Sequence, residues 1–230
     1  MNTRKLFYVT LIISVLVQII TGMIEGWTVL SVNVPSQYTI IKELLYLELF
    51  VQAIEGLFYI WLVYNFTSVI NVTPKRYIDW SITTPTMLTT LIFYLIYLRY
   101  KNENMDTTKL QFYNLLHDNA NTLSKIVSLN WSMLFFGYLG EMKILSTVSG
   151  VVLGFVPFLM YYYMIYQKYA ISSGPLGIKL FWYFFFFWSL YGVVALLPYN
   201  LKNSLYNILD LFAKNFFGLF LSYIILLKKY

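Results

Sequence analysis

Residues 204–227 read SLYNILDLFAKNFFGLFLSYIILL, and this stretch decides how the rest of the chain is organised. At about 1.5 Å of rise per residue, a helix of this length crosses the roughly 30 Å hydrocarbon core of a bilayer. Lys214 lies near its middle, and Asp210 lies one helical turn earlier on the same face. Ionisable groups at that depth are costly, so they face a partner or a water-filled cavity. With Asn203 and Asn207 they form a polar stripe that points into a helix bundle.

Lys214 has two interpretations at this point. The lysine and Asp210 form a structural ion pair between helices, which is a common use of intramembrane charges. Alternatively, an amine held out of water among aromatic side chains acts as a nucleophile and forms a Schiff base with a carbonyl ligand. The rest of the chain has to decide between them.

Composition places the chain among polytopic membrane proteins. Hydrophobic residues make up 59% of the 230 residues and charged residues 11%, and the mean hydropathy is +0.64. There is no cysteine, and the single histidine, His117, lies in a polar loop, so we expect no metal site. The net charge of +6 is scattered over loops, which indicates anionic lipid headgroups as partners and no nucleic acid. No nucleophile has an adjacent base, so we do not expect an enzyme.

Apolar stretches bounded by polar residues, proline or glycine predict one domain, residues 1–230, folded as an all-α bundle of seven transmembrane helices. The expected spans are 5–30, 37–66, 76–99, 123–142, 145–168, 176–197 and 203–228. Lysine and arginine favour the loops after the first, third and fifth spans and the C-terminus, which predicts an integral membrane protein with an extracellular N-terminus and a cytoplasmic C-terminus. The connection 100–122 is expected to form an amphipathic helix on the cytoplasmic headgroups.

The third span opens with RYIDWSITTP, residues 76–85. Arg76, Asp79 and Thr83 share a helix face and direct a cation, a carboxylate and a hydroxyl toward the interior. Pro85 leaves a backbone carbonyl without its helical donor, which neighbouring hydroxyls or water can satisfy. Taken alone, this pattern is also compatible with helix-kink chemistry.

The sixth span supplies aromatic residues, among them Trp188 and Tyr191. With Trp80 they provide the walls that a long apolar ligand requires. A protonated Schiff base also requires nearby negative charge, and Asp79 and Asp210 supply it. The three spans together therefore favour the ligand-binding interpretation of the buried lysine.

The motifs R-Y-x-D-W-x-x-T-T-P, W-x-x-Y and D-x-x-x-K on the third, sixth and seventh spans resemble those of microbial rhodopsins. The resemblance implies all-trans-retinal covalently bound to Lys214 as a protonated Schiff base, with Asp79 and Asp210 as counterions and Arg76 supporting them. The retinal pocket that it implies consists of Tyr59, Trp80, Thr83, Trp188 and Tyr191. Gly192 departs from the proline that many pumps of this family carry, which leaves the bend of the sixth helix open.

A second set of polar residues lies outside these motifs. Glu48 and Glu55 are seven residues apart on the second span, so they share a face inside the membrane. With Ser14, Asn207 and Asn215 they form a candidate polar route between helices one, two, three and seven. Serine and asparagine also act as glue between helices. Two buried glutamates with no basic partner in their own helix are harder to explain in that way.

With these residues and with Asp79, Thr83 and Thr90, the chain resembles the group 1 rhodopsins of large algal viruses. The resemblance implies a light-gated channel for monovalent cations, in which Ser14, Glu55 and Asn215 form a central constriction. An outward proton pump is the alternative: Asp79 can accept a proton, but Thr90 stands where pumps of this family keep a donor carboxylate. A sensory rhodopsin that signals through residues 100–122 is the second alternative. A homo-oligomer is compatible with the sequence.

Overall fold

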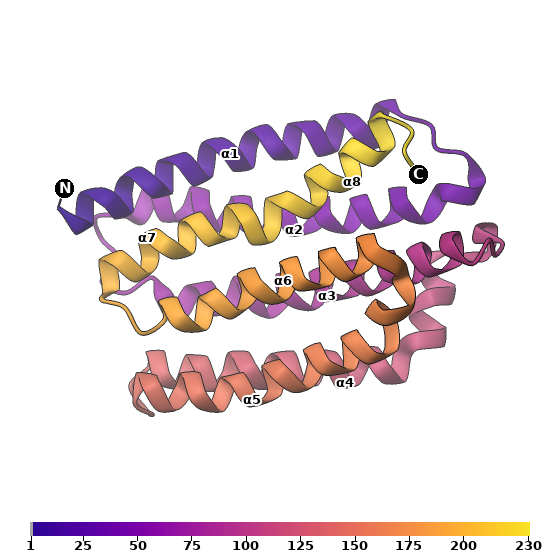
Figure 1. Ribbon diagram of the computed structural model, residues 1–230. Coiled ribbons are helices and arrows are strands. Elements are labelled where there is room, and N and C mark those ends of the chain that lie inside the picture. The colour runs from indigo at the N-terminus through magenta and orange to yellow at the C-terminus, as the bar shows by residue number, and fades with distance from the viewer. Residues whose placement is uncertain (1) are drawn as a thin grey trace.

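The computed structural model describes residues 2–230, and it shows long helices packed side by side in one bundle (Figure 1). The helices are α1 (Thr3–Ser31), α2 (Thr39–Asn65), α3 (Thr73–Asn102), α4 (Phe112–Glu141), α5 (Thr147–Ile165), α6 (Gly174–Val194), α7 (Tyr199–Asp210) and α8 (Phe216–Leu226). A π-helical turn, η5 (Leu211–Asn215), joins α7 to α8 without a break. The described residues therefore form seven helical rods and contain no strand, as the sequence predicts for the fold class.

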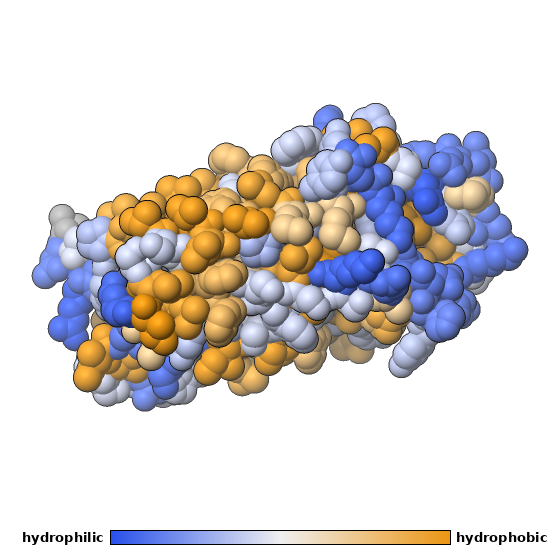
Figure 2. Space-filling view, turned by 90° about the horizontal axis from the view of Figure 1, so that it is seen from below, coloured by the Kyte–Doolittle hydropathy of each residue, from blue (hydrophilic) through white to orange (hydrophobic). Residues whose placement is uncertain are grey.

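One end of the bundle holds the N-terminus and the connections α2–α3, α4–α5 and α6–α7 (Figure 1). We call it the N-terminal end. The opposite end holds the C-terminus and the connections α1–α2, α3–α4 and α5–α6, and we call it the C-terminal end. Apolar residues cover the middle of the face shown in Figure 2, and hydrophilic residues gather toward the two ends, as expected for a bundle that crosses a bilayer.

Five stretches are long and apolar enough to cross a membrane. One of them, Thr147–Val194, contains both α5 and α6, because the turn between them is itself helical: a π-helical segment, η3 (Tyr166–Ala170), and a 3-10 segment, η4 (Ile171–Ser173). Gly174 ends this turn with a φ of +75°, a left-handed conformation that favours glycine. α4 is not among the five, because its first half is polar.

The fourth helix starts earlier than the expected span. α4 begins at Phe112, so the second half of the connection 100–122, which was expected to lie as a separate helix on the headgroups, forms the first turns of α4. Leu110 and Leu115 explain the difference, because both are buried in the main hydrophobic core. Burying these side chains against the bundle extends the helix beyond the apolar stretch.

Pro85 lies inside α3, the helix most enclosed by the others. A proline has no N–H to donate to the carbonyl four residues earlier, which here belongs to Ser81. The Trp131 indole on α4 donates to that Ser81 carbonyl over 2.9 Å. The sequence predicts a hydroxyl or water at this place, whereas the structure satisfies the carbonyl from a neighbouring helix.

Candidate functional site

Lys214 lies in η5, at the centre of the bundle, and its residue is 4% exposed. Single π-helical turns inside α-helices are frequent at functional sites. The Lys214 Nζ is 2.6 Å from Asp79 Oδ2, 3.6 Å from Glu55 Oε1 and 3.8 Å from Asp210 Oδ1. Three carboxyl groups from α2, α3 and α7 thus surround one buried amine.

Asp210 is held from three sides. Tyr59 and Tyr191 each donate a hydroxyl to one of its carboxylate oxygens over 2.6 Å. The Arg76 guanidinium lies 3.3 Å from the same carboxylate. Arg76 is itself fully buried and also donates to Asn203 over 3.1 Å and to Asn207. These contacts fix the orientation of Asp210 beside the lysine.

The charges in this cluster do not balance if every group is ionised. Lys214 and Arg76 carry two positive charges, and Asp79, Asp210 and Glu55 would carry three negative ones. Neither Glu55 oxygen has a hydrogen-bond partner among the described residues. An uncompensated buried charge costs several kcal/mol, so Glu55 is the group best suited to hold a proton.

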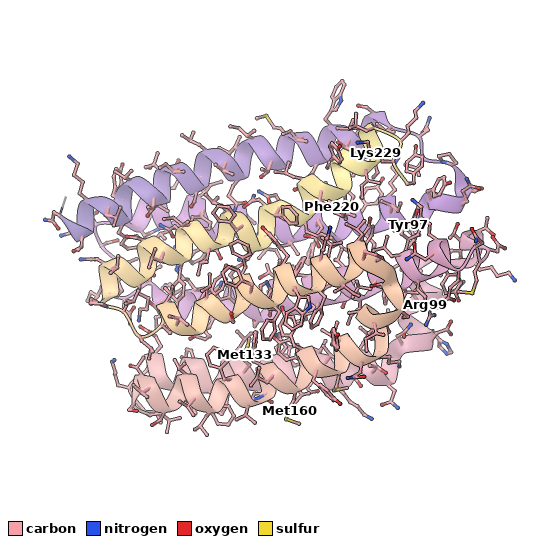
Figure 3. The ribbon with its side chains drawn as sticks, in the orientation of Figure 1. Tyr97, Arg99, Met133, Met160, Phe220 and Lys229 are labelled. Atoms are coloured by element: carbon pink, nitrogen blue, oxygen red, sulfur yellow. The ribbon has the colours of Figure 1, made fainter. Side chains whose placement is uncertain are left out.

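An apolar cavity of about 110 Å³ lies beside the amine. Lys214 is part of its lining, and the other lining residues include Trp80, Met133, Phe158, Trp188 and Tyr191 (Met133 is labelled in Figure 3). Glycines in the lining leave room for neighbouring side chains. A Cβ at Gly137, for example, would lie 2.7 Å from the Tyr77 hydroxyl.

Gly192 also lines the cavity, and a Cβ there would lie 2.5 Å from the Phe155 ring. The helical segment α6 continues through Gly192 to Val194. The residue that departs from the family's proline therefore makes room for an aromatic ring of α5.

Three aromatic rings pack against one another beside the charge cluster. The Trp80 ring meets Tyr191 and Tyr206 edge-on at centroid distances of 5.5 and 5.2 Å. Tyr191 and Tyr206 stack with centroids 5.6 Å apart. No sequence motif singles out Tyr206, although it precedes Asp210 by one helical turn and so shares its face. Thr83 donates to the Asp79 backbone carbonyl over 3.0 Å, and it does not line the cavity.

Two of the candidate pathway residues meet on the N-terminal side of Lys214. Ser14 donates to the Asn207 backbone carbonyl over 3.0 Å, and the Asn207 side chain donates to Thr10 over 3.1 Å. Ser14 therefore contacts α7 one turn before the charge cluster and makes no hydrogen bond to Asn215. Ser14 and Asn215, both expected in a central constriction, thus contact different partners.

Asn215 instead joins a cluster of neutral side chains on the C-terminal side. Its side chain bonds to Gln18 and Thr21 of α1 and to Gln52 of α2. These three residues are not among those predicted from the sequence. A signal existed, because Gln52 lies three residues before Glu55 and four after Glu48, on their face of the helix.

Two further carboxyl groups lie beyond this cluster. Glu48 faces the Thr90 hydroxyl and lies near Glu25. Both glutamates are buried, and Glu25 Oε2 and Glu48 Oε1 have no hydrogen-bond partner among the described residues. A Cβ at Gly218 would overlap the Glu25 carboxyl, so the glycine of α8 makes room for it.

Known proteins resemble this chain over its whole length. The family model for bacteriorhodopsin-like proteins matches residues 7–227. The crystal structure of viral rhodopsin OLPVRII is 27% identical, with complete coverage of both chains and a TM-score of 0.79. A search of curated proteins found no match.

More distant structures share the fold. Blue light-absorbing proteorhodopsin from Med12 is 18% identical over 97% of this chain and 99% of its own, with a TM-score of 0.72. Bromide-bound halorhodopsin from Halobacterium salinarum is 16% identical over 99% and 97%, with a TM-score of 0.73. The buried lysine on the seventh rod, its carboxylate neighbours and the match along nearly the entire chain lead to one conclusion: this chain is a membrane protein of the bacteriorhodopsin-like family, a microbial rhodopsin.

Proposed function

We propose that the protein is a retinal-binding photoreceptor that acts as a light-gated channel for monovalent cations. Its N-terminal end faces the outside of the cell and its C-terminal end the cytoplasm. One observation carries the channel proposal: buried polar side chains follow the bundle past Lys214 from one end toward the other. In order from the N-terminal end they include Asn203, Arg76, Asn207, Asp210, Asp79, Glu55, Asn215, Gln52, Glu48 and Glu25.

The residues around Lys214 fit covalently bound retinal. The Lys214 Nζ stands at the edge of an apolar cavity whose walls are aromatic rings, methionines and glycines. Asp79 lies 2.6 Å from that nitrogen and can hold a positive charge on it. When bound, all-trans-retinal supplies the absorption of visible light and a change of shape at the nitrogen.

The side chains of the protein do the remaining work. A proton that passes from Lys214 Nζ to Asp79 neutralises both groups, because they form an ion pair before the transfer. Asp210 keeps its charge, since two tyrosine hydroxyls and the Arg76 guanidinium stabilise it. The loss of one ion pair from the cluster changes the electrostatic attraction on Arg76 and the surroundings of the protonated Glu55 carboxyl, which lies 3.6 Å from the amine.

Carboxyl oxygens along a pore favour cations over anions, because they can replace part of a cation's hydration shell. Glu55, Glu48 and Glu25 offer oxygen atoms that no described residue satisfies. A hydrated or partly dehydrated cation can bind such oxygens in passing. These three glutamates are the selectivity elements of the proposed pathway.

Voltage clamp of illuminated cells that express the protein tests the proposal. A channel passes a photocurrent that reverses sign near the cation equilibrium potential. A photocurrent that keeps one direction at all potentials would instead establish the outward proton pump, which the 2.6 Å contact between Lys214 and Asp79 also favours. Absence of any current in protein that has bound retinal would leave the sensory alternative and overturn the channel.

A further inference from the structure

We propose that Gln18, Thr21, Gln52 and Asn215 form a gate, here called the amide lock, that closes the pathway between Glu55 and Glu48 in the dark. This inference rests on the proposed channel function. It adds three residues outside the expected pathway and assigns them one shared action.

The amide lock joins three rods through its own side chains. The Asn215 amide donates to Thr21 over 2.7 Å and to Gln52 Oε1 over 2.9 Å. Gln18 donates to Asn215 Oδ1 over 3.3 Å. Gln52 donates to the Gln18 backbone carbonyl over 2.8 Å and to the Gln18 side-chain oxygen. The amides thus satisfy one another, with no charged group among them.

The lock differs in kind from the groups on either side of it. Glu55 and Glu48 present oxygens without hydrogen-bond partners among the described residues. The side chains of the lock contain no such unpartnered atom. All four members are buried, with exposed fractions between 2% and 6%. A cation leaving the charge cluster therefore meets a neutral, internally satisfied barrier that offers no free oxygen. Passage requires the hydrogen bonds of the lock to break.

Asn215 connects the lock to the light-sensitive centre. It follows Lys214 directly in the π-helical turn η5, so a rotation of that turn moves both side chains. A movement that carries Asn215 away from α1 and α2 breaks its bonds to Gln18, Thr21 and Gln52 together. A displacement of Lys214 therefore opens the amide lock through the next residue in the chain, Asn215.

The test substitutes Gln52→Met, which keeps the length of the side chain and removes its hydrogen bonds to Gln18 and Asn215. Because the closed state loses these bonds, we expect channel closing after a light pulse to slow by roughly tenfold, the equivalent of about one net hydrogen bond, and the dark current to rise. Gln18→Met is expected to act in the same direction. Channel closing in the double variant should be as slow as in the slower of the two single variants and no slower, because all these hydrogen bonds belong to one unit. Gln111→Met is the matched control, since Gln111 is exposed just before α4 and makes no side-chain cap.

Visible absorbance of each purified variant shows that it has folded and bound retinal. If the unmodified protein conducts and both methionine variants close at its rate without added dark current, the amide lock is wrong while the channel stands. Light-minus-dark infrared spectra of protein labelled with carbonyl-¹³C glutamine provide a readout independent of current. Labelled bands that vanish in Gln52→Met show that light changes the hydrogen bonds of the lock, and the absence of any labelled band overturns it.

Discussion

Arg76 is the buried charge on which the N-terminal half of the site depends. It is fully buried and lies 3.3 Å from Asp210, a separation at which the Coulomb attraction is about 5 kcal/mol at an effective dielectric constant near 20, before desolvation. Removing one partner of such a pair leaves the other charge unpaired and costs about 3–5 kcal/mol. Arg76→Gln is therefore expected to lower the free energy of unfolding by about 3 kcal/mol, the lower end of that range, because Tyr59 and Tyr191 still donate to Asp210.

A double-mutant cycle isolates the pair. Unfolding of Arg76→Gln, Asp210→Asn and the double variant is measured by titration with sodium dodecyl sulfate, followed by helical ellipticity. The double variant should be more stable than the sum of the single effects predicts, by about 1–3 kcal/mol, because both partners are then neutral and no charge is left unpaired.

The peripheral ion pair of Lys202 with Glu141 is the control for this cycle. Lys202 Nζ and Glu141 Oε2 are 2.6 Å apart, and the side chains of Lys202 and Glu141 are 8% and 10% exposed. The same cycle with Lys202→Met and Glu141→Gln should give a smaller coupling energy, because these side chains are more exposed than those of Arg76 and Asp210, which are 1% exposed. Single effects of Arg76→Gln and Asp210→Asn that add within about 0.5 kcal/mol would refute the assigned role of Arg76.

Three further predictions concern the amine and its carboxyl neighbours. Lys214→Ala is expected to give a folded but colourless protein after incubation with retinal, and a normal visible band would contradict the proposed attachment. Asp79→Asn removes the negative charge nearest to Nζ, at 2.6 Å, so the visible absorption maximum should move to longer wavelength, measured in purified protein. Glu55→Gln should change the reversal potential or the size of the photocurrent and leave the absorption maximum nearly in place; a colour change as large as that of Asp79→Asn would show that Glu55 is ionised.

The sequence alone predicts which face of its helix each of these charged residues occupies. A period of 3.6 residues places Asp210 and Lys214 on one face of the seventh rod and Arg76, Asp79 and Thr83 on one face of the third. The length of each apolar stretch limits the fold to membrane-spanning helices. These are properties of single helices, so local residue spacing is enough to predict them.

Residue spacing along one helix predicts neither the start of α4 nor the hydrogen-bond partner of the Ser81 carbonyl. Phe112 begins a helix because Leu110 and Leu115 find a core to pack against, and Trp131 reaches Ser81 because α4 lies next to α3. Both facts depend on which rods are neighbours and how they are rotated. Periodicity specifies neither.

The sequence by itself determined that this protein is a membrane bundle of the rhodopsin kind, with a lysine and two aspartates directed inward. Only the tertiary structure decided that Glu55 lies 3.6 Å from that lysine and that Gln18 and Gln52 meet Asn215. The physical reason is that spacing along one helix fixes which face a side chain occupies. The distance between side chains on different helices is fixed by packing, which involves residues far apart in the chain.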